Sequence, residues 1–212
     1  MKTAIIIPAY NEEKTIADII KKAKHYGDVI VINDASRDNT EAAAKKAGAK
    51  VVTHKVNSGL GCALRTGFKK AIDSNYSIII TMDADGQHRP EDIKKFIDKI
   101  GEGYDFVLGK RDLSKYPIVK KFGNFFLRSM TNMLSSTNLS DTESGFRAFS
   151  AGALKKLDLK AERYEIATEI VYEAGRNKLK CCNVPVSSPV YKKGVKIRDG
   201  VKNFVYLLKK RY

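Results

Sequence analysis

Short apolar runs alternate with helical patterns through the first half of the chain. The apolar runs predict strands at residues 3–7, 28–32, 50–53, 77–82 and 104–108. Apolar residues at helical spacing predict helices at 12–25, 40–47, 61–71 and 90–100 between them. Asn11 stands where it would cap the first of these helices. Strands that alternate with helices predict βαβ units and a mostly parallel central sheet sandwiched by helices.

The second half of the chain has a different pattern. It predicts an amphipathic helix at 117–134, a strand at 145–149, a helix at 165–174 and a last strand at 180–190. The apolar stripe of the amphipathic helix consists of Val119, Phe122, Phe126, Met130 and Met133. Pro185 and Pro189 favour an edge position for the last strand. We expect an α/β fold with a small antiparallel element in this half.

Composition sets broad limits on the class of protein. A chain of 212 residues with 43% hydrophobic and 30% charged residues is typical of a folded globular protein. No linker or repeat divides it, so we expect one domain over 1–212. Cys62, Cys181 and Cys182 form neither a disulfide framework nor a Cys-x-x-Cys metal motif, which favours a cytoplasmic setting. No stretch approaches the roughly 18 apolar residues of a transmembrane helix.

The net charge of +15 is concentrated in the second half of the chain. Residues 101–212 hold 22 basic and 11 acidic residues, against 17 and 13 in residues 1–100. Such an excess suggests an anionic partner, either a phosphorylated substrate, an anionic bilayer surface or nucleic acid. Simple solubility is the alternative. Nucleic acid is the weakest choice, because no recognised binding module or basic–aromatic platform accompanies the charge.

Two carboxylates follow the most apolar strand directly. Ile78, Ile79 and Ile80 show no polar alternation, which suits a strand covered on both faces, and Asp83 and Asp85 come at its carboxyl end. Open α/β sheets bind ligands at that edge. Two oxygen donors placed there suit Mg²⁺ or Mn²⁺, which keeps several waters and takes one or two carboxylates. An acidic turn without a ligand is the alternative.

Polar residues also end the neighbouring strands. The first strand leads into Pro8, Tyr10 and Glu12, and the second leads into Asp34. Asp34 could accept hydrogen bonds from a nucleobase or a ribose, or it could cap the next helix, a role that Asp38 fills better. The run NSGLG at 57–61 has glycines that could bring backbone N–H groups to an anion at a helix start. It lacks the spacing of a dinucleotide-binding or P-loop motif.

Five motifs in order resemble one enzyme family. The runs PAYNE, INDASRDNT, NSGLGCALRTG and DADGQH resemble the family 2 glycosyltransferases of the Rossmann-like GT-A fold. DTESGFR at 141–147 is similar to the DxxSGFR of their dolichol-phosphate mannose synthase branch. The resemblance covers about residues 1–190. It implies a half that binds a nucleotide sugar, 1–110, and an acceptor-binding half, 111–212.

The resemblance also implies roles for individual residues. The positions that match the nucleoside site are Pro8, Tyr10, Glu12 and Asp34. Those that match the divalent-metal and diphosphate site are Asp83, Asp85 and Gln87. Basic positions that face the donor diphosphate or the acceptor phosphate are Arg111, Arg128 and Arg147. Asp85 and these three arginines are expected to carry catalysis, whereas His88 is expected to be a loop or donor-contact residue and not a metal ligand.

The implied reaction is metal-dependent, inverting transfer of a hexose to polyprenyl or dolichyl phosphate. Mannose from GDP-mannose is the expected donor sugar. A lipid phosphate is already ionised and needs little help from a base, whereas a saccharide or protein hydroxyl does, with UDP-glucose or a related donor. Glu143, Glu165 and Glu169 could supply such a base, or they could be capping or solvent-facing acids. A non-catalytic protein that binds nucleotide sugars or membranes is a further alternative.

A membrane surface is the expected partner of the second half. Phe122, Phe125, Phe126 and Leu127 give the helix at 117–134 more apolar surface than one core-facing stripe needs, and Lys120, Lys121 and Arg128 flank them. This suits a helix at an anionic bilayer interface, with core packing or a dimer contact as alternatives. Lys192, Lys193, Lys196 and Arg198 could add reversible docking or form a closing loop. We expect a peripheral protein at the cytoplasmic face of the membrane.

Overall fold

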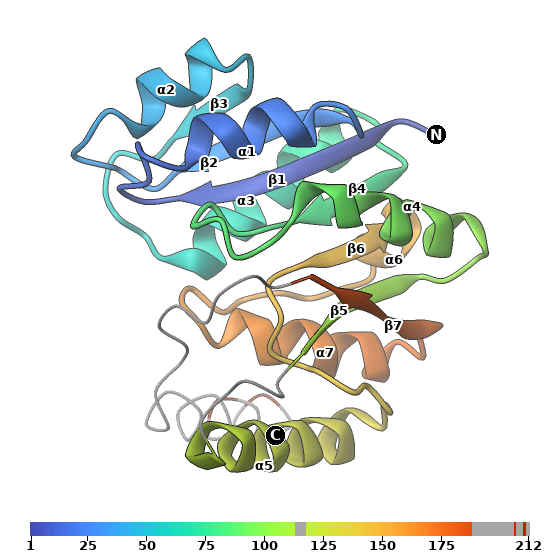
Figure 1. The fold of residues 1–212 in the computed structure, drawn as a ribbon. Helices are drawn as coiled ribbons and strands as arrows, with labels where there is room; N and C mark the ends of the chain where they lie inside the picture. The colour runs from blue at the N-terminus through green and yellow to red at the C-terminus, as the bar shows by residue number, and fades with distance from the viewer. Residues whose placement is uncertain (113–117, 188–205, 207–209, 211–212) are drawn as a thin grey trace.

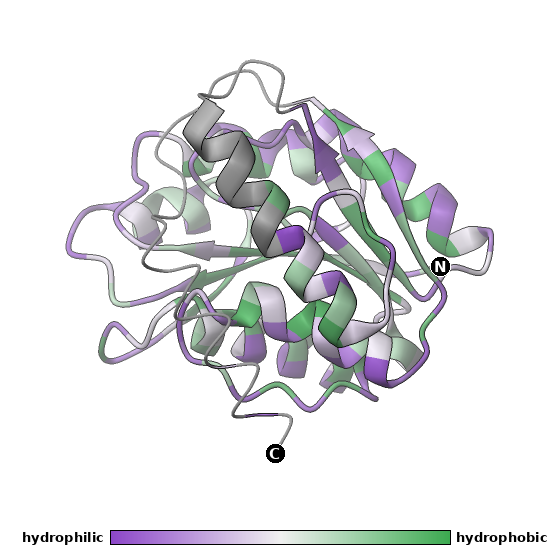
Figure 2. Ribbon diagram, turned by 90° about the horizontal axis from the view of Figure 1, so that it is seen from below, coloured by the Kyte–Doolittle hydropathy of each residue, from purple (hydrophilic) through white to green (hydrophobic). Residues whose placement is uncertain are grey.

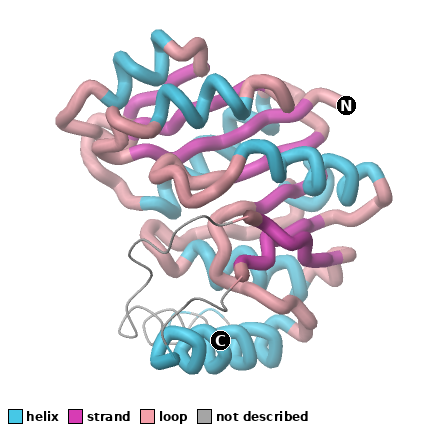
Figure 3. The backbone as a smooth tube through the Cα atoms, viewed as in Figure 1, coloured by secondary structure: helices cyan, strands magenta, loops and turns pink. Residues whose placement is uncertain are grey.

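A seven-stranded sheet runs through the centre of the described part of the chain (Figures 1 and 3). The computed structural model describes residues 1–112 and 118–187 together with Tyr206 and Lys210, without the side chains of 118–124, 126 and 127. The strands are β1 (Thr3–Ala9), β2 (Asp28–Asn33), β3 (Lys50–Thr53), β4 (Ile78–Thr81), β5 (Phe106–Arg111), β6 (Arg147–Ser150) and β7 (Cys181–Val186).

The strand order is β3-β2-β1-β4-β6-β5-β7. Strand β6 runs antiparallel to both of its neighbours, β4 and β5, whereas every other described pair is parallel. The predicted fold, a mostly parallel sheet with an antiparallel element in the second half, is therefore confirmed. Strand β7 pairs with β5 alone among these strands and forms an edge, as the prolines predicted. Pro185 lies in it, while Pro189 lies outside the described residues.

Helices cover both faces of the sheet. One face carries α1 (Ile16–Ala23), α2 (Thr40–Lys46) and α4 (Ile93–Gly101), which the short 3-10 helix η1 (Pro90–Asp92) precedes. The other face carries α3 (Leu60–Asp73), α6 (Ala151–Leu154) and α7 (Ile166–Arg176). Helix α5 (Ile118–Ser135) packs on the outer side of α7 (Figure 1). The four-residue helix α6 was not predicted. No helix in the described ranges is long and apolar enough to cross a membrane.

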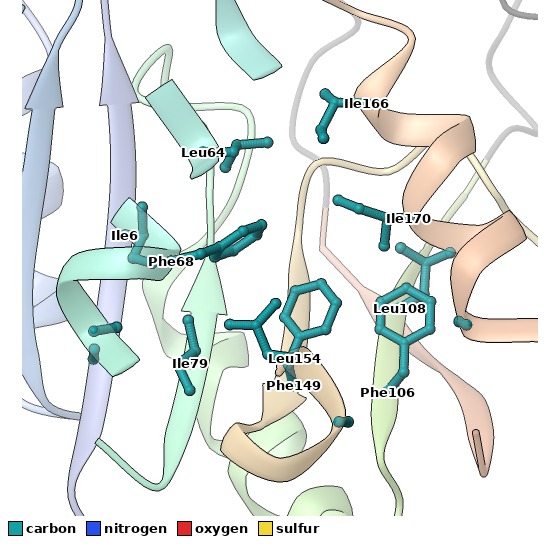
Figure 4. Packing of buried hydrophobic residues seen from close by; sticks show 14 of the residues in the cluster. Ile6, Leu64, Phe68, Ile79, Phe106, Leu108, Phe149, Leu154, Ile166 and Ile170 are labelled. Atoms are coloured by element: carbon teal, nitrogen blue, oxygen red, sulfur yellow. The ribbon is translucent and has the colours of Figure 1, made fainter. Parts of the chain in front are cut away.

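Each strand of the sheet contributes side chains to two hydrophobic cores, one on each face. In β1, Ile6 packs with α3 on one face, and Ile5 and Ile7 pack with α1 and α4 on the other. On the α3 face, Phe149 contacts both Phe68 and Phe106, with ring centroids 5.4 and 5.0 Å away (Figure 4). Each large side chain that is fully buried contributes about 1.5–3 kcal/mol. Hydrophobic and hydrophilic residues alternate along the helices, as expected for amphipathic helices that pack one side against a sheet (Figure 2).

The first helix starts later than predicted. It begins at Ile16, and Asn11 does not cap it. Asn11 instead adopts a φ of 58° and joins two loops, because its N–H donates to Ser36 Oγ and its Oδ1 accepts from the Arg37 N–H. Asparagine tolerates this left-handed conformation better than most residues do. Asn11 therefore ties the end of β1 to the loop after β2.

Helix α5 departs from the predicted apolar stripe at Met133, whereas Met130 is half-buried and the side chains of Val119, Phe122 and Phe126 lie outside the described residues. Thr131 and Ser135 are buried, whereas Met133, from the predicted apolar stripe, is 65% exposed. The stripe is wrong at this position because α5 meets α7 through small residues. Ser135 donates its hydroxyl to the Thr131 carbonyl inside the helix, at 2.7 Å. The Ser135 carbonyl lies where only a glycine, Gly175 of α7, leaves room.

This close approach predicts that Gly175→Ala destabilises the protein. A Cβ at 175 would lie 1.7 Å from the Ser135 carbonyl oxygen, so the two backbones must separate. We expect a loss of about 1–3 kcal/mol in the free energy of unfolding. That loss exceeds the gain of up to about 1 kcal/mol that alanine brings to a helix. Denaturant-induced unfolding measures the difference.

Gly152→Ala in α6 is the matched control, because nothing lies within 4 Å of its added Cβ. It should leave stability unchanged or raise it slightly. Equal stability of the Gly175→Ala and wild-type proteins would contradict the close packing of α5 on α7.

Candidate active site

The predicted site residues gather where parallel strands end. Asp34 follows β2 and donates its backbone N–H to the Ala9 carbonyl at the end of β1. Asp83 follows β4, which lies on the other side of β1. On the far side of β4, Thr81 pairs with Arg147, the first residue of β6. The sheet thus brings one acidic and one basic segment to the same edge.

The turn after β4 fixes the second carboxylate. Asp85 accepts hydrogen bonds from the Gln87 backbone N–H, at 2.9 Å, and from the Gln87 side-chain amide. Gly86 between them has a φ of +80°, a conformation that favours glycine. Gln87 therefore orients Asp85, whereas its own role as a metal ligand stays a prediction.

His88 holds the backbone of Asp83 through a hydrogen bond. The ring is buried, packs against Phe146 with centroids 5.0 Å apart, and accepts the Asp83 backbone N–H at Nδ1, at 3.1 Å. Burial lowers the pKa of His88, despite the charges of Asp83 and Asp85. A neutral ring that accepts at Nδ1 carries its proton on Nε2, which lies 3.7 Å from Asp83 Oδ2. This geometry suits a residue that positions Asp83 and leaves metal ligation to the carboxylates.

A glycine makes room for the Asp83 carboxylate. A Cβ at Gly145 would lie 2.6 Å from both carboxylate oxygens of Asp83, so a larger residue there would displace that carboxylate. Thr81 holds the same backbone by donating its hydroxyl to the Gly145 carbonyl at 2.8 Å. The glycine of the DTESGFR run thus supports the aspartate of the DADGQH run.

The carboxylates fit the hard cation that the sequence suggests. In the described ranges no three His, Cys, Asp or Glu side chains group together as a complete protein metal site. Mg²⁺ and Mn²⁺ do not need one, because they are commonly bound through one or two carboxylates, water and substrate phosphates. Asp83 and Asp85 supply such a pair on one partly exposed turn.

An aspartate fixes the first of the predicted arginines. Arg111 donates from Nε to Asp141 Oδ2 at 2.8 Å and from Nη2 to Oδ1 at 3.0 Å. Asp141 is buried and also accepts the backbone N–H groups of Arg111 and Glu143. A bidentate pair of this kind sets the plane of the guanidinium. Asp141 lay in the quoted motif, but the sequence alone did not indicate this positioning role.

Arg147 is a buried cation beside the aspartates. Its side chain is 2% exposed, and its Nε has no hydrogen-bond partner among the described residues. Burial lowers the pKa of Arg147, while Asp83, Glu143 and Asp141 oppose that change. A buried donor without a partner is unfavourable, so this position fits an anionic ligand.

Arg128 reaches the same loop from α5. It donates to the Ser140 carbonyl at 3.4 Å and lies over the Phe125 ring, 5.1 Å from its centroid. The structure therefore brings all three predicted arginines to the segment 140–147. Whether they contact a phosphate stays a prediction.

The three candidate bases have different surroundings. Glu169 is fully buried and accepts three hydrogen bonds from the Lys160 and Ala161 backbone, so it cannot face an acceptor. Glu165 stands just before α7 and is half-buried. Glu143 is half-buried, so it does not face solvent freely. This burial, together with the charge of Asp141, raises the pKa of Glu143.

The nucleoside candidates lie on the first two strand ends. Tyr10 is exposed, while Pro8 and Glu12 are half-buried. Glu12 accepts the Thr15 hydroxyl at 3.1 Å. Asp34 is 5% exposed, and its carboxylate is not a helix cap. That role belongs to Asp38, which accepts the N–H of Thr40 at the start of α2.

Asp34 binds the loop before α3. Its Oδ1 accepts the Ser58 N–H at 2.9 Å and lies 2.8 Å from His54 Nδ1, while Oδ2 accepts the Gly59 N–H at 2.8 Å. Gly61 and the next residue donate their N–H groups to the Glu162 carbonyl. These four N–H groups already have protein acceptors.

The glycines of the NSGLG run therefore serve packing. A Cβ at Gly61 would lie 2.2 Å from the Ala161 carbonyl oxygen, and one at Gly59 would lie 2.6 Å from that of Glu162. The N–H group of Gly59 does bind an anion, but this anion is the protein's own Asp34 carboxylate, and the Gly61 N–H binds the Glu162 carbonyl.

Comparison with known proteins now decides the family. A family model described as glycosyl transferase family 2 matches residues 4–158. This chain belongs to glycosyl transferase family 2. The predicted family is confirmed, and the protein is a glycosyltransferase.

Relatives of the glycosyltransferase have names that agree on one kind of acceptor. It is 36% identical to the UDP-N-acetylglucosamine–dolichyl-phosphate N-acetylglucosaminyltransferase of Methanococcus voltae, over 96% of this chain and 94% of the relative. It is 27% identical to the polyprenol monophosphomannose synthase of Mycolicibacterium smegmatis, over 94% of this chain and 82% of the relative.

A solved structure confirms the fold of the glycosyltransferase. Glucosyl-3-phosphoglycerate synthase of Mycobacterium tuberculosis, in complex with Mn²⁺, UDP and glucosyl-3-phosphoglycerate, matches with a TM-score of 0.78. The match covers 99% of this chain and 79% of the other at 20% identity. At that identity the likeness concerns the fold alone.

Gly145→Ala tests how the glycosyltransferase holds its acidic turn. The added Cβ pushes the Asp83 carboxylate aside, so we expect Mn²⁺ affinity to fall about 10–100-fold, the usual effect of disturbing a metal-ligand support. Calorimetric titration with Mn²⁺ measures it. Gly152→Ala should bind Mn²⁺ like the wild type, and unchanged affinity in Gly145→Ala would contradict the role of Asp83.

Proposed function

We propose that this glycosyltransferase moves a sugar from a nucleotide sugar to polyprenyl or dolichyl phosphate. One observation carries the proposal: the buried cation Arg147, with an unpaired Nε, lies one strand from the aspartate turn and shares Asp141 with Arg111 as a charge partner. Such a cluster of charges suits two phosphate-bearing substrates. The names of the relatives from Methanococcus voltae and Mycolicibacterium smegmatis support a lipid-phosphate acceptor.

The acidic turn would hold the donor diphosphate through Mg²⁺ or Mn²⁺. Asp83 and Asp85 would bind the cation, with Gln87 as a further proposed ligand, and the bound cation would neutralise the charge that develops on the leaving diphosphate. The Mn²⁺ and UDP in the structural relative from Mycobacterium tuberculosis support this assignment. His88 would keep Asp83 in place through the hydrogen bond at Nδ1.

The arginines would bind and align the acceptor phosphate. Asp141 holds Arg111 in one orientation, which favours planar recognition of phosphate oxygens. The acceptor is an anion before it reacts, so positioning and charge stabilisation would supply most of the catalysis. Burial raises the pKa of Glu143, which makes its carboxylate a stronger base when it is ionised, so the Glu143→Gln variant tests whether the reaction uses a base.

The donor binds, in this proposal, at the ends of the first two strands. Proposed nucleoside contacts are Pro8, Tyr10, Glu12 and Asp34. Asp34 Oδ2 accepts one protein hydrogen bond and can accept a second from a base or ribose. The expected sugar, mannose, agrees with the name of the mycolicibacterial relative, whereas the relative at 36% identity is named for UDP-N-acetylglucosamine. We propose UDP-N-acetylglucosamine first and GDP-mannose second.

Helix α5 is the proposed contact with the membrane surface. Phe125 and Met133 are exposed, and their spacing of eight residues places both on one side of the helix. Arg128 lies between them in sequence and over the Phe125 ring. An apolar face with a nearby cation suits the interface of an anionic bilayer, here proposed as the cytoplasmic one. The basic residues Lys192, Lys193, Lys196 and Arg198 lie outside the described residues.

The acceptor is tested by following sugar transfer into lipid. Incubation with radiolabelled donor, dolichyl phosphate and Mn²⁺ should give a chloroform-soluble product, and EDTA or Asp85→Asn should abolish it. Glu143→Gln and Glu165→Gln should keep rates within about threefold, because loss of a true general base lowers rates by about 10²–10⁴. Transfer to a free sugar hydroxyl, with none to the lipid, would overturn the proposed acceptor.

The donor is tested by calorimetric titration in the presence of Mn²⁺. UDP-N-acetylglucosamine should bind at least about tenfold more tightly than GDP-mannose, a difference of roughly 1.4 kcal/mol. Asp85→Asn provides the control, since it should weaken whichever donor binds. Tighter binding of GDP-mannose would reverse the order of the two donors.

A further inference from the structure

A lysine near the end of the chain is buried on helix α7. Lys210 Nζ lies 2.5 Å from Glu169 Oε1 and 3.3 Å from Glu173 Oε1. The Lys210 side chain is 10% exposed, while the two glutamate side chains are almost fully buried. Tyr206 donates its hydroxyl to Glu169 at 2.8 Å. Two carboxylates in the interior need a cation nearby, and Lys210 is the buried one within reach.

The same carboxylates hold the loop 158–161. Glu169 accepts the backbone N–H groups of Lys160 and Ala161, at 2.9–3.1 Å. Glu173 accepts the Asp158 N–H at 3.2 Å, and Lys210 donates to the Asp158 carbonyl. The loop therefore depends on the two carboxylates, which pair with Lys210 and, at Glu173, also with Arg176 at 3.5 Å.

The loop in turn holds the start of α3. The Glu162 carbonyl accepts the N–H groups of Gly61 and Cys62, at 2.8 and 3.2 Å. Just before them, the N–H groups of Ser58 and Gly59 bind the two oxygens of Asp34. Hydrogen bonds, together with the short backbone segments 161–162 and 59–61 between them, thus join Lys210 to the strand end where the nucleoside is proposed to bind.

We propose that Lys210 is a positioning residue for donor binding. By fixing Glu169 and Glu173 it keeps the 158–162 backbone against α3, and this keeps the Asp34 loop in the shape that receives the nucleoside. The inference rests on the proposed function for its ligand, but not for the contacts themselves. Helix α7 also has its own hydrophobic anchor in Ile166 and Ile170, so loss of the lysine should loosen the loop before it unfolds the protein.

The first measurement is independent of any substrate. Hydrogen exchange on the full-length protein reports how firmly the Ala161 and Gly61 amides are held. In Lys210→Met both should exchange about tenfold faster, whereas Lys210→Arg, which keeps the charge, should resemble the wild type. Lys156→Met, which removes an exposed lysine near this loop, is the matched control. Unchanged exchange at both amides in Lys210→Met would overturn the proposal.

The second measurement connects the loop to the donor. Titration with UDP and with GDP in the presence of Mn²⁺ gives the affinity of the nucleotide that the wild type binds. Lys210→Met should weaken it about tenfold and raise the donor KM with little change in kcat, and Lys210→Arg should restore both. Faster exchange with unchanged nucleotide affinity would overturn the positioning role. A wild-type protein that binds neither nucleotide would instead contradict the proposed function.

Tyr206→Phe offers a milder variant if Lys210→Met does not fold. It removes one hydrogen bond to Glu169 and leaves Lys210 in place. We expect a smaller change in the same direction, about two- to threefold in both amide exchange and nucleotide affinity. No change in either quantity would count against the proposal.

Discussion

The antiparallel pairing of β4 with β6 is the constraint on which the candidate site depends. It sets Thr81 opposite Arg147, so the turn with two aspartates that follows β4 lies beside a strand that begins with an arginine. The segment before β6 then passes under the aspartate turn, where Gly145 leaves room for the Asp83 carboxylate. In a sheet with parallel strands only, the start of β6 would lie at the opposite edge.

Nearby acids offset the charge of the arginine that this pairing buries. A buried guanidinium is unfavourable unless acids surround it, and Arg147 has Asp83, Asp141 and Glu143 nearby. Asp141 is also engaged with Arg111 through two hydrogen bonds. The cluster is therefore preorganised, so the proposed binding of a phosphate there would require little rearrangement of charged side chains. Such preorganisation is the main source of catalysis where no covalent step by the protein is needed.

Backbone contacts extend this order from the site to the end of the chain. Glycines at 59 and 61 allow the 161–162 backbone to close on α3, and Glu169 holds that backbone from the other side. Asp34 binds the same α3 loop from the strand edge. Residues that the sequence suggested as ligands or bases thus also hold loops, because a buried carboxylate readily accepts several backbone N–H groups.

The sequence by itself determined most of the helices and strands, the mostly parallel sheet and the family, because apolar periodicity and ordered motifs are local properties. It also placed Asp83 and Asp85 at a strand end. Only the tertiary structure decided how distant segments meet: that Asp141 fixes Arg111, that Glu169 is buried on a lysine, and that Met133 faces outward. Those outcomes depend on which backbone segments approach closely and which charged side chains are buried together. The spacing of residues along the sequence does not indicate either.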